Sequence, residues 1–229
     1  MSQAWPESSS SRAFARTILV VEDNDFMRGL ISDSLELKGF SVAAAASAVD
    51  ARRLLDRLDP DAVILDIDLG SGPTGLDLAE MIQAKASDVA ILFLTSIPDP
   101  RFAGKPDATV QKNVAYLNKN LLKDTGVLIE ALEAVLTERS LSSFRHNELE
   151  SRPLSKLSRT QIQVLQLLAE GKTNQQIADI RKRSLAATSS AVTRTLEAIG
   201  ITETADQNVR VAAAVEYVSK VGLARTNVL

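Results

Sequence analysis

The stretch Asp61-Ala-Val-Ile-Leu-Asp66-Ile-Asp68-Leu-Gly70 decides the fold class of this chain. Its four consecutive apolar residues, at positions 62–65, predict a strand that is buried on both faces, as strands are in a parallel sheet. Because it is costly to remove a carboxylate from water, an aspartate directly after such a strand needs a functional reason. Ligands in open α/β sheets bind beyond the carboxyl ends of the strands. We therefore expect Asp66 to be chemically active.

Apolar runs and helical patterns alternate on both sides of this strand. Four further strands are expected, at residues 17–21, 40–46, 89–95 and 114–117. Apolar residues at helical spacing fill most of the intervals, and a last helical pattern follows at residues 128–135. This alternation predicts a parallel sheet with helices on both faces, joined by right-handed crossovers. Five strands within about 120 residues fit an α/β, doubly wound, flavodoxin-like unit with the strand order 2-1-3-4-5.

Polar residues end four of the predicted strands, and these ends meet at one edge of a parallel sheet. They are Glu22 and Asp23, Asp66, Thr95, and Lys119. Carboxylates brought together repel one another, and oxygen ligands of this kind are what Mg²⁺ takes. An ionised aspartate beside Mg²⁺ can attack a phosphoryl donor, while a lysine and a threonine stabilise the group in transfer. Each residue alone would be an ordinary polar strand end, but their coincidence favours a site.

With these residues in place, residues 17–138 resemble a response-regulator receiver domain. The resemblance implies a role for each matching position: Asp66 is the phosphoacceptor, Thr95 the switch hydroxyl, Tyr116 the aromatic switch residue, and Lys119 a phosphate-binding residue. It further implies that Mg²⁺ is held by Asp23, Asp66 and the backbone carbonyl of Asp68, with Glu22 nearby through water. The phosphoryl donor that the resemblance implies is a sensor histidine kinase.

Three features depart from the receiver pattern. Asn120 follows Lys119 where receivers usually have proline, so a cis peptide is not expected there. Asp68 adds a negative charge beside the phosphoacceptor, and the segment at residues 97–110 contains Pro98, Pro100, Gly104 and Pro106. A regular helix cannot run through so many prolines, because proline lacks the backbone donor and its ring clashes with the preceding turn. In receivers the helix at this place usually belongs to the output and dimerisation face. We therefore expect an irregular loop or a short helix here, and a changed dimer surface.

The rest of the chain has a different pattern. Residues 139–153 are polar and are expected to form a linker to a second unit at residues 154–229. In that unit, apolar residues at helical spacing fall into four short groups, with Gly171, Ser184 and Gly200 between them. Four short helices around one small core predict the four-helix form of the helix-turn-helix.

This second unit resembles a LuxR/NarL-type DNA-binding domain. The resemblance rests on Leu157-Ser-Arg-Thr-Gln161, on the Glu-Gly pair at 170–171, and on Asn174 followed by Ile177-Ala178. The third helix of such domains enters the major groove. The resemblance implies that Ser189, Ser190, Thr193 and Arg194 face the bases, and that Lys172, Lys182, Arg183 and the hydroxyl of Ser184 hold phosphates. The third helix has one basic residue, so a helical unit used for protein contacts is the alternative.

The charge distribution and the residue composition favour some kinds of function and exclude others. Residues from Arg152 onward contain 11 lysines and arginines and six acidic residues, a net charge of +5, which leaves −8 for the preceding part because the whole chain carries −3. A basic unit joined to an acidic one suggests different partners, with nucleic acid for the basic one. The absence of cysteine excludes disulfides and cysteine-based zinc sites, and the single histidine, His146, makes a histidine-based triad implausible.

The first 16 residues, with serines at 8–11, predict a disordered leader, and no signal peptide or membrane span is expected. We thus expect a cytoplasmic transcriptional response regulator that is not a turnover enzyme. Its expected partners are a histidine kinase, double-stranded DNA and, at least on DNA, a second copy of the chain. The first alternative is a receiver that acts without phosphorylation, through protein or DNA contacts. The second is an enzyme, because Asp66-Ile-Asp68 also resembles the nucleophile and acid of haloacid-dehalogenase-type phosphatases.

Overall fold

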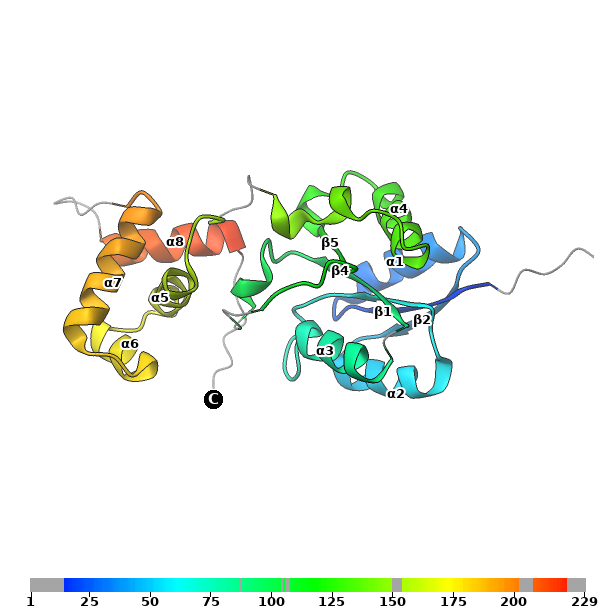
Figure 1. Cartoon of the computed structure of the whole chain (residues 1–229), viewed down its shortest axis with the longest axis horizontal. Helices are drawn as coiled ribbons and strands as arrows, with labels where there is room; N and C mark the ends of the chain where they lie inside the picture. The colour runs from blue at the N-terminus through cyan, green and yellow to red at the C-terminus, as the bar shows by residue number, and fades with distance from the viewer. Residues whose placement is uncertain are drawn as a thin grey trace, which may run out of the picture.

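The chain forms an α/β unit followed by a smaller helical unit (Figure 1). The computed structural model describes residues 15–86, 88–103, 105, 108–149, 154–201 and 208–221. The predicted disordered leader therefore lies almost wholly outside the described residues. Among the described helices, none has the length and apolar character needed to cross a membrane.

A five-stranded parallel sheet forms the centre of the α/β unit. Its strands are β1 (Thr17–Val21), β2 (Ser41–Ala45), β3 (Ala62–Leu65), β4 (Ala90–Thr95) and β5 (Ala115–Asn118). Their order is β2-β1-β3-β4-β5, which confirms the predicted fold class. The strand that precedes Asp66, β3, lies in the middle of the sheet, and its four residues are at most 1% exposed.

Helices cover both faces of the sheet, as the alternating pattern predicts. They are α1 (Asp25–Glu36), α2 (Ala48–Leu58), α3 (Gly75–Lys85) and α4 (Thr125–Leu136). Apolar residues of α1 and α4 pack on one face, and those of α2 and α3 pack on the other (Figure 1). Each helix begins at a side chain that accepts a hydrogen bond from the first turn: Asn24, Ser47, Thr74 and Asp124.

The segment between β4 and β5 contains no regular helix among its described residues, as its prolines predict. It forms one short 3-10 turn, η1 (Pro100–Phe102), and otherwise runs as a loop. Asp99 caps this turn through its carboxylate, which accepts from the Arg101 amide at 3.0 Å. Proline suits the start of a helical turn because the missing donor would be unpaired there in any case.

Residues after α4 return to the edge of the sheet. They form two 3-10 turns, η3 (Ser142–Phe144) and η4 (His146–Glu148), and Arg145 between the turns pairs with Tyr116 of β5. The buried Arg145 guanidinium donates to the carbonyls of Val110, Gln111 and Val114. These residues of the predicted linker therefore cover the otherwise open β5 edge.

The described residues of the helical unit, 154–201 and 208–221, form four helices. They are α5 (Arg159–Ala169), α6 (Asn174–Arg181), α7 (Leu185–Ala198) and α8 (Val209–Val221). Ser158, Thr173 and Ser184 cap the first three helices. Helix α5 is central, because its apolar residues pack against α8 on one side and against α6 and α7 on the other. This arrangement matches the predicted four-helix form.

Candidate functional site

The acidic turn after β1 lies at the carboxyl edge of the sheet. Glu22 is 2% exposed, and Asp23 beside it is half-buried. Arg28, one turn into α1, donates from Nη1 to the Glu22 carbonyl at 2.7 Å and to the Asp23 carbonyl at 3.4 Å. Arg28 also pairs with Asp25. The arginine thus fixes the backbone that presents both carboxylates, a role that sequence reasoning missed.

Lys119 joins two of the predicted carboxylates. Its Nζ lies 2.7 Å from Asp66 Oδ2 and 2.5 Å from Glu22 Oε2. Burial alone would lower the pKa of Lys119, but the charges and hydrogen bonds of Asp66 and Glu22 outweigh it and raise that pKa. Burial also raises the pKa of Glu22, and the Asp66 charge adds to this effect, while Lys119 opposes it. The ammonium is therefore firmly protonated between its partners.

Three carboxylates converge beside this lysine. Glu22, Asp23 and Asp66 each offer an oxygen, and these oxygens lie within 4.8 Å of one another. One ammonium opposes three carboxylates, so two negative charges remain when all of these groups are ionised. A divalent cation would balance that charge, and carboxylate oxygens are the ligands that Mg²⁺ prefers. The donor set thus fits the predicted metal.

The loop after Asp66 is closely packed against α3. At Gly75, the first residue of α3, a Cβ atom would lie 2.0 Å from the Asp66 carbonyl oxygen. Within the loop, the Asp68 amide donates to Asp66 Oδ1 at 3.3 Å, and the Asp68 carboxylate accepts from the Gly70 amide at 3.4 Å. The additional charge of Asp68 is therefore directed toward its own loop, and its side chain is not among the three that converge.

Thr95 and Tyr116 both contact the backbone of Ile97. Thr95 ends β4 and is fully buried, and its Oγ1 accepts from the Ile97 amide at 3.3 Å. The phenol of Tyr116, also fully buried, donates to the Ile97 carbonyl at 2.8 Å. Burial raises the pKa of Tyr116 well above its usual value, and the charges of Asp99 and Asp66 add to the effect. The two predicted switch residues thus hold one and the same neighbour.

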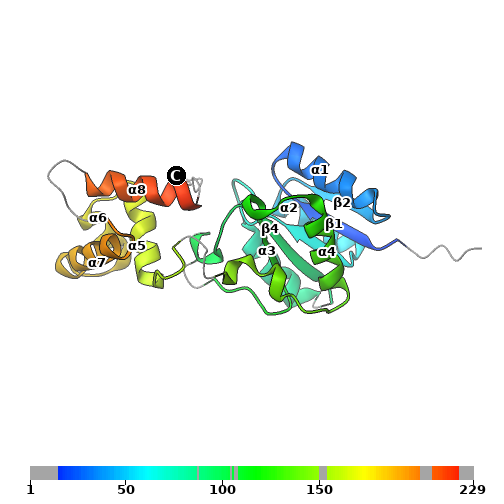
Figure 2. The ribbon, with the colours of Figure 1, turned by 90° about the horizontal axis from the view of Figure 1, so that it is seen from above.

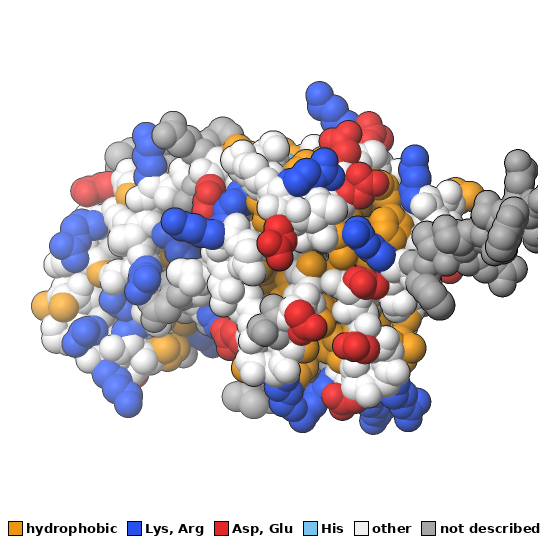
Figure 3. Space-filling view, turned by 45° about the vertical axis from the view of Figure 1, so that its right-hand side comes forward, with side chains coloured by type: hydrophobic (Ala, Val, Ile, Leu, Met, Phe, Trp, Pro, Cys, Tyr) orange, Lys and Arg blue, Asp and Glu red, His pale blue; other side chains and the backbone are white. Residues whose placement is uncertain are grey.

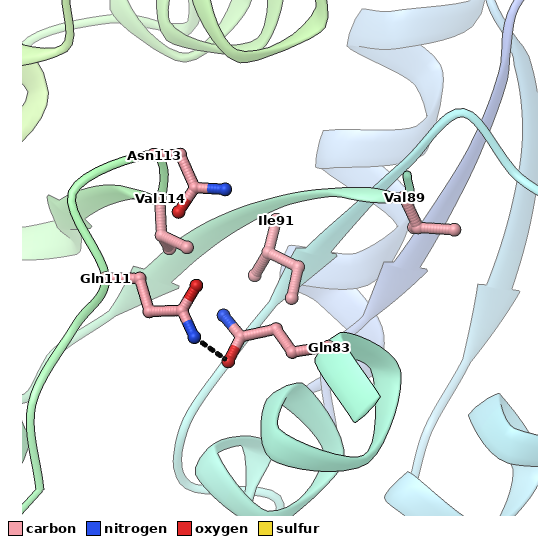
Figure 4. Close-up of a pocket in the computed structure, with 6 residues that line it drawn as sticks. All are labelled: Gln83, Val89, Ile91, Gln111, Asn113 and Val114. Carbon is pink, nitrogen blue, oxygen red and sulfur yellow. Dashed lines mark hydrogen bonds between the residues drawn. The ribbon is translucent and has the colours of Figure 1, made fainter. Parts of the chain in front are cut away.

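A small pocket lies at the amino ends of the strands, opposite the carboxylate site. Its lining consists of Gln83, Val89, Ile91, Gln111, Asn113 and Val114, with Gln111 Nε2 donating to Gln83 Oε1 at 2.9 Å (Figure 4). Val89 and Val114 directly precede β4 and β5, so this pocket is at the amino ends of the strands. It is therefore separate from the carboxylate site.

The candidate DNA-facing residues occupy one side of α7. Ser190, Thr193 and Arg194 are exposed, and Ser189 is half-buried. The Ser189 hydroxyl accepts from Asn174 Nδ2 at 3.2 Å, which ties α7 to the start of α6. The hydroxyls of Ser190 and Thr193 donate to carbonyls one turn earlier in the same helix, at 3.1 and 3.2 Å. Their oxygens can still accept hydrogen bonds, whereas Arg194 is the one charged donor of the four.

The candidate phosphate-binding residues flank the turns on both sides of α6. Lys182 and Arg183 are exposed at its carboxyl end, and Ser184 caps α7 by accepting from the Ala187 amide at 3.2 Å. Lys172 precedes α6 and is half-buried. Figure 3 shows lysine and arginine side chains spread over the helical unit with few acidic ones among them, as the net charge of this part predicts.

Arg210 of α8 holds the turn at which Lys172 lies. It donates from Nη1 to Asn174 Oδ1 at 2.9 Å and from Nη2 to the Lys172 carbonyl. Sequence reasoning missed this contact because the partners are more than 30 positions apart. Arg181, which stands at a position that is generally apolar in such domains, donates to Gln163 Oε1 at 3.2 Å. Burial and the neighbouring Arg183 charge lower the pKa of Arg181.

Two family models match the chain. The model of the response regulator receiver domain matches residues 18–133, and that of the bacterial regulatory proteins of the luxR family matches residues 155–202. The nitrate/nitrite response regulator protein NarP of Escherichia coli K12 is 32% identical over 175 residues, which cover 71% of this chain and 79% of NarP. The DNA-binding transcriptional activator DevR/DosR of Mycobacterium tuberculosis is 28% identical over 172 residues, which cover 71% of this chain and 78% of that protein.

A solved structure has the same fold. RcsB of Salmonella enterica serovar Typhimurium, bound to the promoter rprA, matches 89% of this chain and 99% of its own with a TM-score of 0.57 at 20% identity. The sequence matches confirm the predicted family and favour a transcription regulator over the phosphatase alternative. The chain belongs to the NarL/LuxR family of response regulators, in which a receiver domain is joined to a LuxR-type DNA-binding domain.

Proposed function

We propose that this chain is a transcription factor controlled by phosphoryl transfer from a sensor histidine kinase to Asp66. The observation that carries the proposal is the convergence of Glu22, Asp23, Asp66 and Lys119 at one edge of the sheet. Parallel strands bring their carboxyl ends together at one edge of the sheet, where ligands bind in open α/β sheets. The sheet topology therefore accounts for the proximity of these four side chains. Charge balance between three carboxylates and one ammonium also supports Mg²⁺ as the ion that the site takes.

The transfer step is a displacement at phosphorus. A carboxylate oxygen of Asp66 forms a bond to phosphorus while the bond from phosphorus to the donor imidazole breaks, and the imidazole nitrogen takes the electron pair. Lys119, which is already 2.7 Å from Asp66, would balance charge on the incoming group. Thr95 would donate its hydroxyl hydrogen to a phosphoryl oxygen, and Tyr116 would respond through Ile97.

Mg²⁺, when bound, would neutralise charge on the carboxylates and on the phosphoryl group. The residues that would hold it are Asp23, Asp66 and the backbone carbonyl of Asp68, with Glu22 nearby through water. Lys119 pairs with both Glu22 and Asp66 in this structure, and Asp23 is the third carboxylate that converges with them.

Intact mass after incubation with acetyl phosphate and Mg²⁺ tests this proposal. The expected result is the mass gain of one phosphoryl group, which Asp66→Asn abolishes. Asp68→Asn is the matched control, because it removes the neighbouring carboxylate and keeps the backbone carbonyl. We expect this variant to gain the same mass. A gain that survives Asp66→Asn would move the phosphoacceptor to another residue.

We further propose that the helical unit binds double-stranded DNA as a homodimer. Two relatives support this, because DevR/DosR is a DNA-binding transcriptional activator and RcsB forms dimers bound to DNA. The exposed side of α7 with Ser189, Ser190, Thr193 and Arg194 would enter the major groove. Lys172, Lys182, Arg183 and Ser184 would contact phosphates. Footprinting at low salt tests the proposal, and the absence of any protected sequence would contradict it.

A phosphorylation-independent regulator is the second candidate. The observation that favours it is that the described part of the segment between β4 and β5, where receivers usually have a helix of the output face, forms only the short turn η1. Comparison of the DNA affinities of the unmodified wild type, the phosphorylated wild type and Asp66→Asn distinguishes the two candidates. Equal affinities would favour the second one, and a rise that occurs only in the phosphorylated wild type would favour the first.

A further inference from the structure

The chain after α4 places a histidine against the edge strand of the sheet. Figures 1 and 2 show it turning back past the sheet on its way to the helical unit. In the turn η4, the ring nitrogen Nδ1 of His146 accepts a hydrogen bond from the Asn118 amide at 3.0 Å. Asn118 is the last residue of β5, is 5% exposed, and stands in register with Thr95 of β4. His146 therefore supplies an acceptor to a buried amide of the edge strand.

Asn118 in turn shapes the short turn η2 (Lys119–Leu121) that follows it. Its Oδ1 accepts from the Asn120 amide at 2.9 Å, and its Nδ2 donates to the Ser96 carbonyl at 3.4 Å. Asn120 stands where receivers usually have proline, and proline has no amide hydrogen with which to make the first of these bonds. The turn is thus closed by hydrogen bonds of one side chain. Its backbone position depends on the residue that His146 holds.

The first residue of η2 carries the positive charge of the site. The side chain of Lys119, which is 14% exposed, reaches Asp66 at 2.7 Å and Glu22 at 2.5 Å. A shift of the Asn118 backbone would move the root of this side chain directly, because the two residues are neighbours in the chain. Loss of the acceptor at His146 favours such a shift, since a buried amide without a partner costs free energy until it finds another one.

The position of His146 is fixed by the segment around it. Arg145, which is 7% exposed, forms a bridge to Tyr116 of β5. Leu141 and Phe144, which precede it, pack in the hydrophobic cluster on the face of the sheet that α1 and α4 cover. Because both flanks are anchored in this way, the imidazole is built into the edge of the sheet.

The charged groups beside His146 have partners of their own. On its own segment, Arg145 pairs with Glu148 at 2.7 Å. On the side of the strand, Lys119 pairs with the site carboxylates. Burial lowers the pKa of His146 from its ordinary value. At neutral pH the ring is therefore uncharged, and Nδ1 can accept a hydrogen bond.

We propose that His146 is a positioning residue for phosphoryl transfer to Asp66, because it fixes the backbone from which Lys119 reaches the site. The inference rests on the proposed function and adds to it a residue from beyond the five strands. A protonated ring carries a hydrogen on Nδ1 and cannot accept from the Asn118 amide. The turn η2 then moves, and Lys119 balances the charge of the incoming phosphoryl group less well. Phosphoryl transfer therefore slows when His146 is protonated or replaced.

The rate at which acetyl phosphate with Mg²⁺ adds mass to the full chain tests this role. At neutral pH we expect His146→Leu to react about tenfold more slowly than the wild type. The ratio of the two rates should approach one as the pH falls from about 6.5 through the lowered pKa of His146, because the wild type then loses the same hydrogen bond. Glu22, whose pKa burial raises, titrates in both proteins, so the ratio reports on His146. Ser143→Leu, which adds the same side chain at an exposed position of the same segment, should keep the wild-type rate.

Two results would overturn the positioning role and leave the proposed function standing. One is an equal rate of His146→Leu and wild type at neutral pH. The other is a ratio that stays constant at every pH, since a substitution that acts only through stability does not follow the protonation of the ring. If acetyl phosphate adds no mass to the wild type, the proposed function itself fails, and the role of His146 falls with it. Where His146→Leu does not fold, His146→Ala takes its place, because removal of a half-buried ring opens no space in the core.

Discussion

At the scale of single residues, Gly75 and His146 help to position the backbone of the carboxylate site, although neither is one of its charged side chains. Gly75 permits the Asp66 carbonyl to lie against the first turn of α3, where any larger side chain would meet that oxygen. His146, from the turn after α4, uses Nδ1 to accept a hydrogen bond from the Asn118 amide at 3.0 Å, next to Lys119. Gly75 thus sets the position of the Asp66 backbone, and His146 holds the residue directly before Lys119.

Gly75→Ala should displace the phosphoacceptor loop. The added Cβ would lie 2.0 Å from the Asp66 oxygen, so either that loop or α3 must shift. We expect phosphorylation by acetyl phosphate to slow by at least about tenfold, because in-line attack depends on position. Intact mass against time measures the rate. The control is Gly29→Ala in α1, where a Cβ would meet nothing within 4 Å. That change should raise the free energy of unfolding by about 1 kcal/mol and leave the rate alone. Equal rates in the two variants would contradict the prediction.

Protonation of His146 should lower the free energy of unfolding in mild acid. Burial lowers its pKa, and the protonated ring has no acceptor left at Nδ1 for the Asn118 amide. Between the lowered pKa and the ordinary value of about 6.5, the unfolded chain binds more protons, so the free energy of unfolding rises with pH there. The contribution is complete above about pH 6.5 and is lost as the pH falls through the lowered pKa. Urea unfolding of wild type and His146→Asn should differ most near neutral pH and converge in acid. A constant difference at all pH values would refute the role.

At the scale of elements, local patterns predicted most of the secondary structure. The predicted strand at 17–21 coincides with β1, and the polar strand ends meet at one edge, because burial and alternation are properties of neighbouring residues. The proline-rich segment also behaved as its composition indicates. Contacts between distant positions were missed. Arg28 and Arg210 act on backbone carbonyls, and Phe102 packs in another unit, and no local pattern predicts such partners.

Helix α7 should discriminate weakly between DNA sequences. It presents one arginine with three hydroxyl-bearing residues, and arginine to guanine is the commonest specific contact. We expect Arg194→Ala to weaken the free energy of binding to the preferred DNA site by about 1–3 kcal/mol. Binding to unrelated DNA should weaken much less. Lys182→Ala should weaken binding to all sequences alike and reduce the salt slope by about one. Gel shifts over a range of salt concentrations measure both effects, with Lys38→Ala on the α/β unit as control. If Arg194→Ala lost the same affinity for all DNA sequences, Arg194 would not be a residue that recognises bases.

At the scale of the whole molecule, an acidic and a basic part are joined through a shared hydrophobic cluster. Phe102 and Ile97 supply the receiver side of that cluster, and α5 and α8 supply the other side. Energetic coupling of this kind is reciprocal, so a change at the carboxylate site that favours DNA binding implies that DNA favours the same change. Phosphorylation should therefore proceed further at equilibrium in the presence of operator DNA.

Heat should unfold the two units of the wild type together. Loss of the helical core would expose Phe102, and loss of the receiver would leave a space among Leu165, Ala213 and Tyr217. Calorimetry should show one transition for the wild type and two for Phe102→Ala, since the variant uncouples the cores. Phe26→Ala should keep the single transition. Two transitions in the wild type would show that the shared cluster does not couple the units.

The position of Phe102 also bears on how such a protein can change its parts in evolution. A chimera that joined this helical unit to a foreign receiver would lack the ring that fills the space between α5 and α8. A vacancy left by a buried phenylalanine costs about 3–5 kcal/mol, a large share of the stability of a small domain. Recombination at the linker would therefore yield an output unit that folds poorly. The two halves are expected to be inherited as a pair, with substitutions in the 97–102 segment matched by substitutions in α5 and α8.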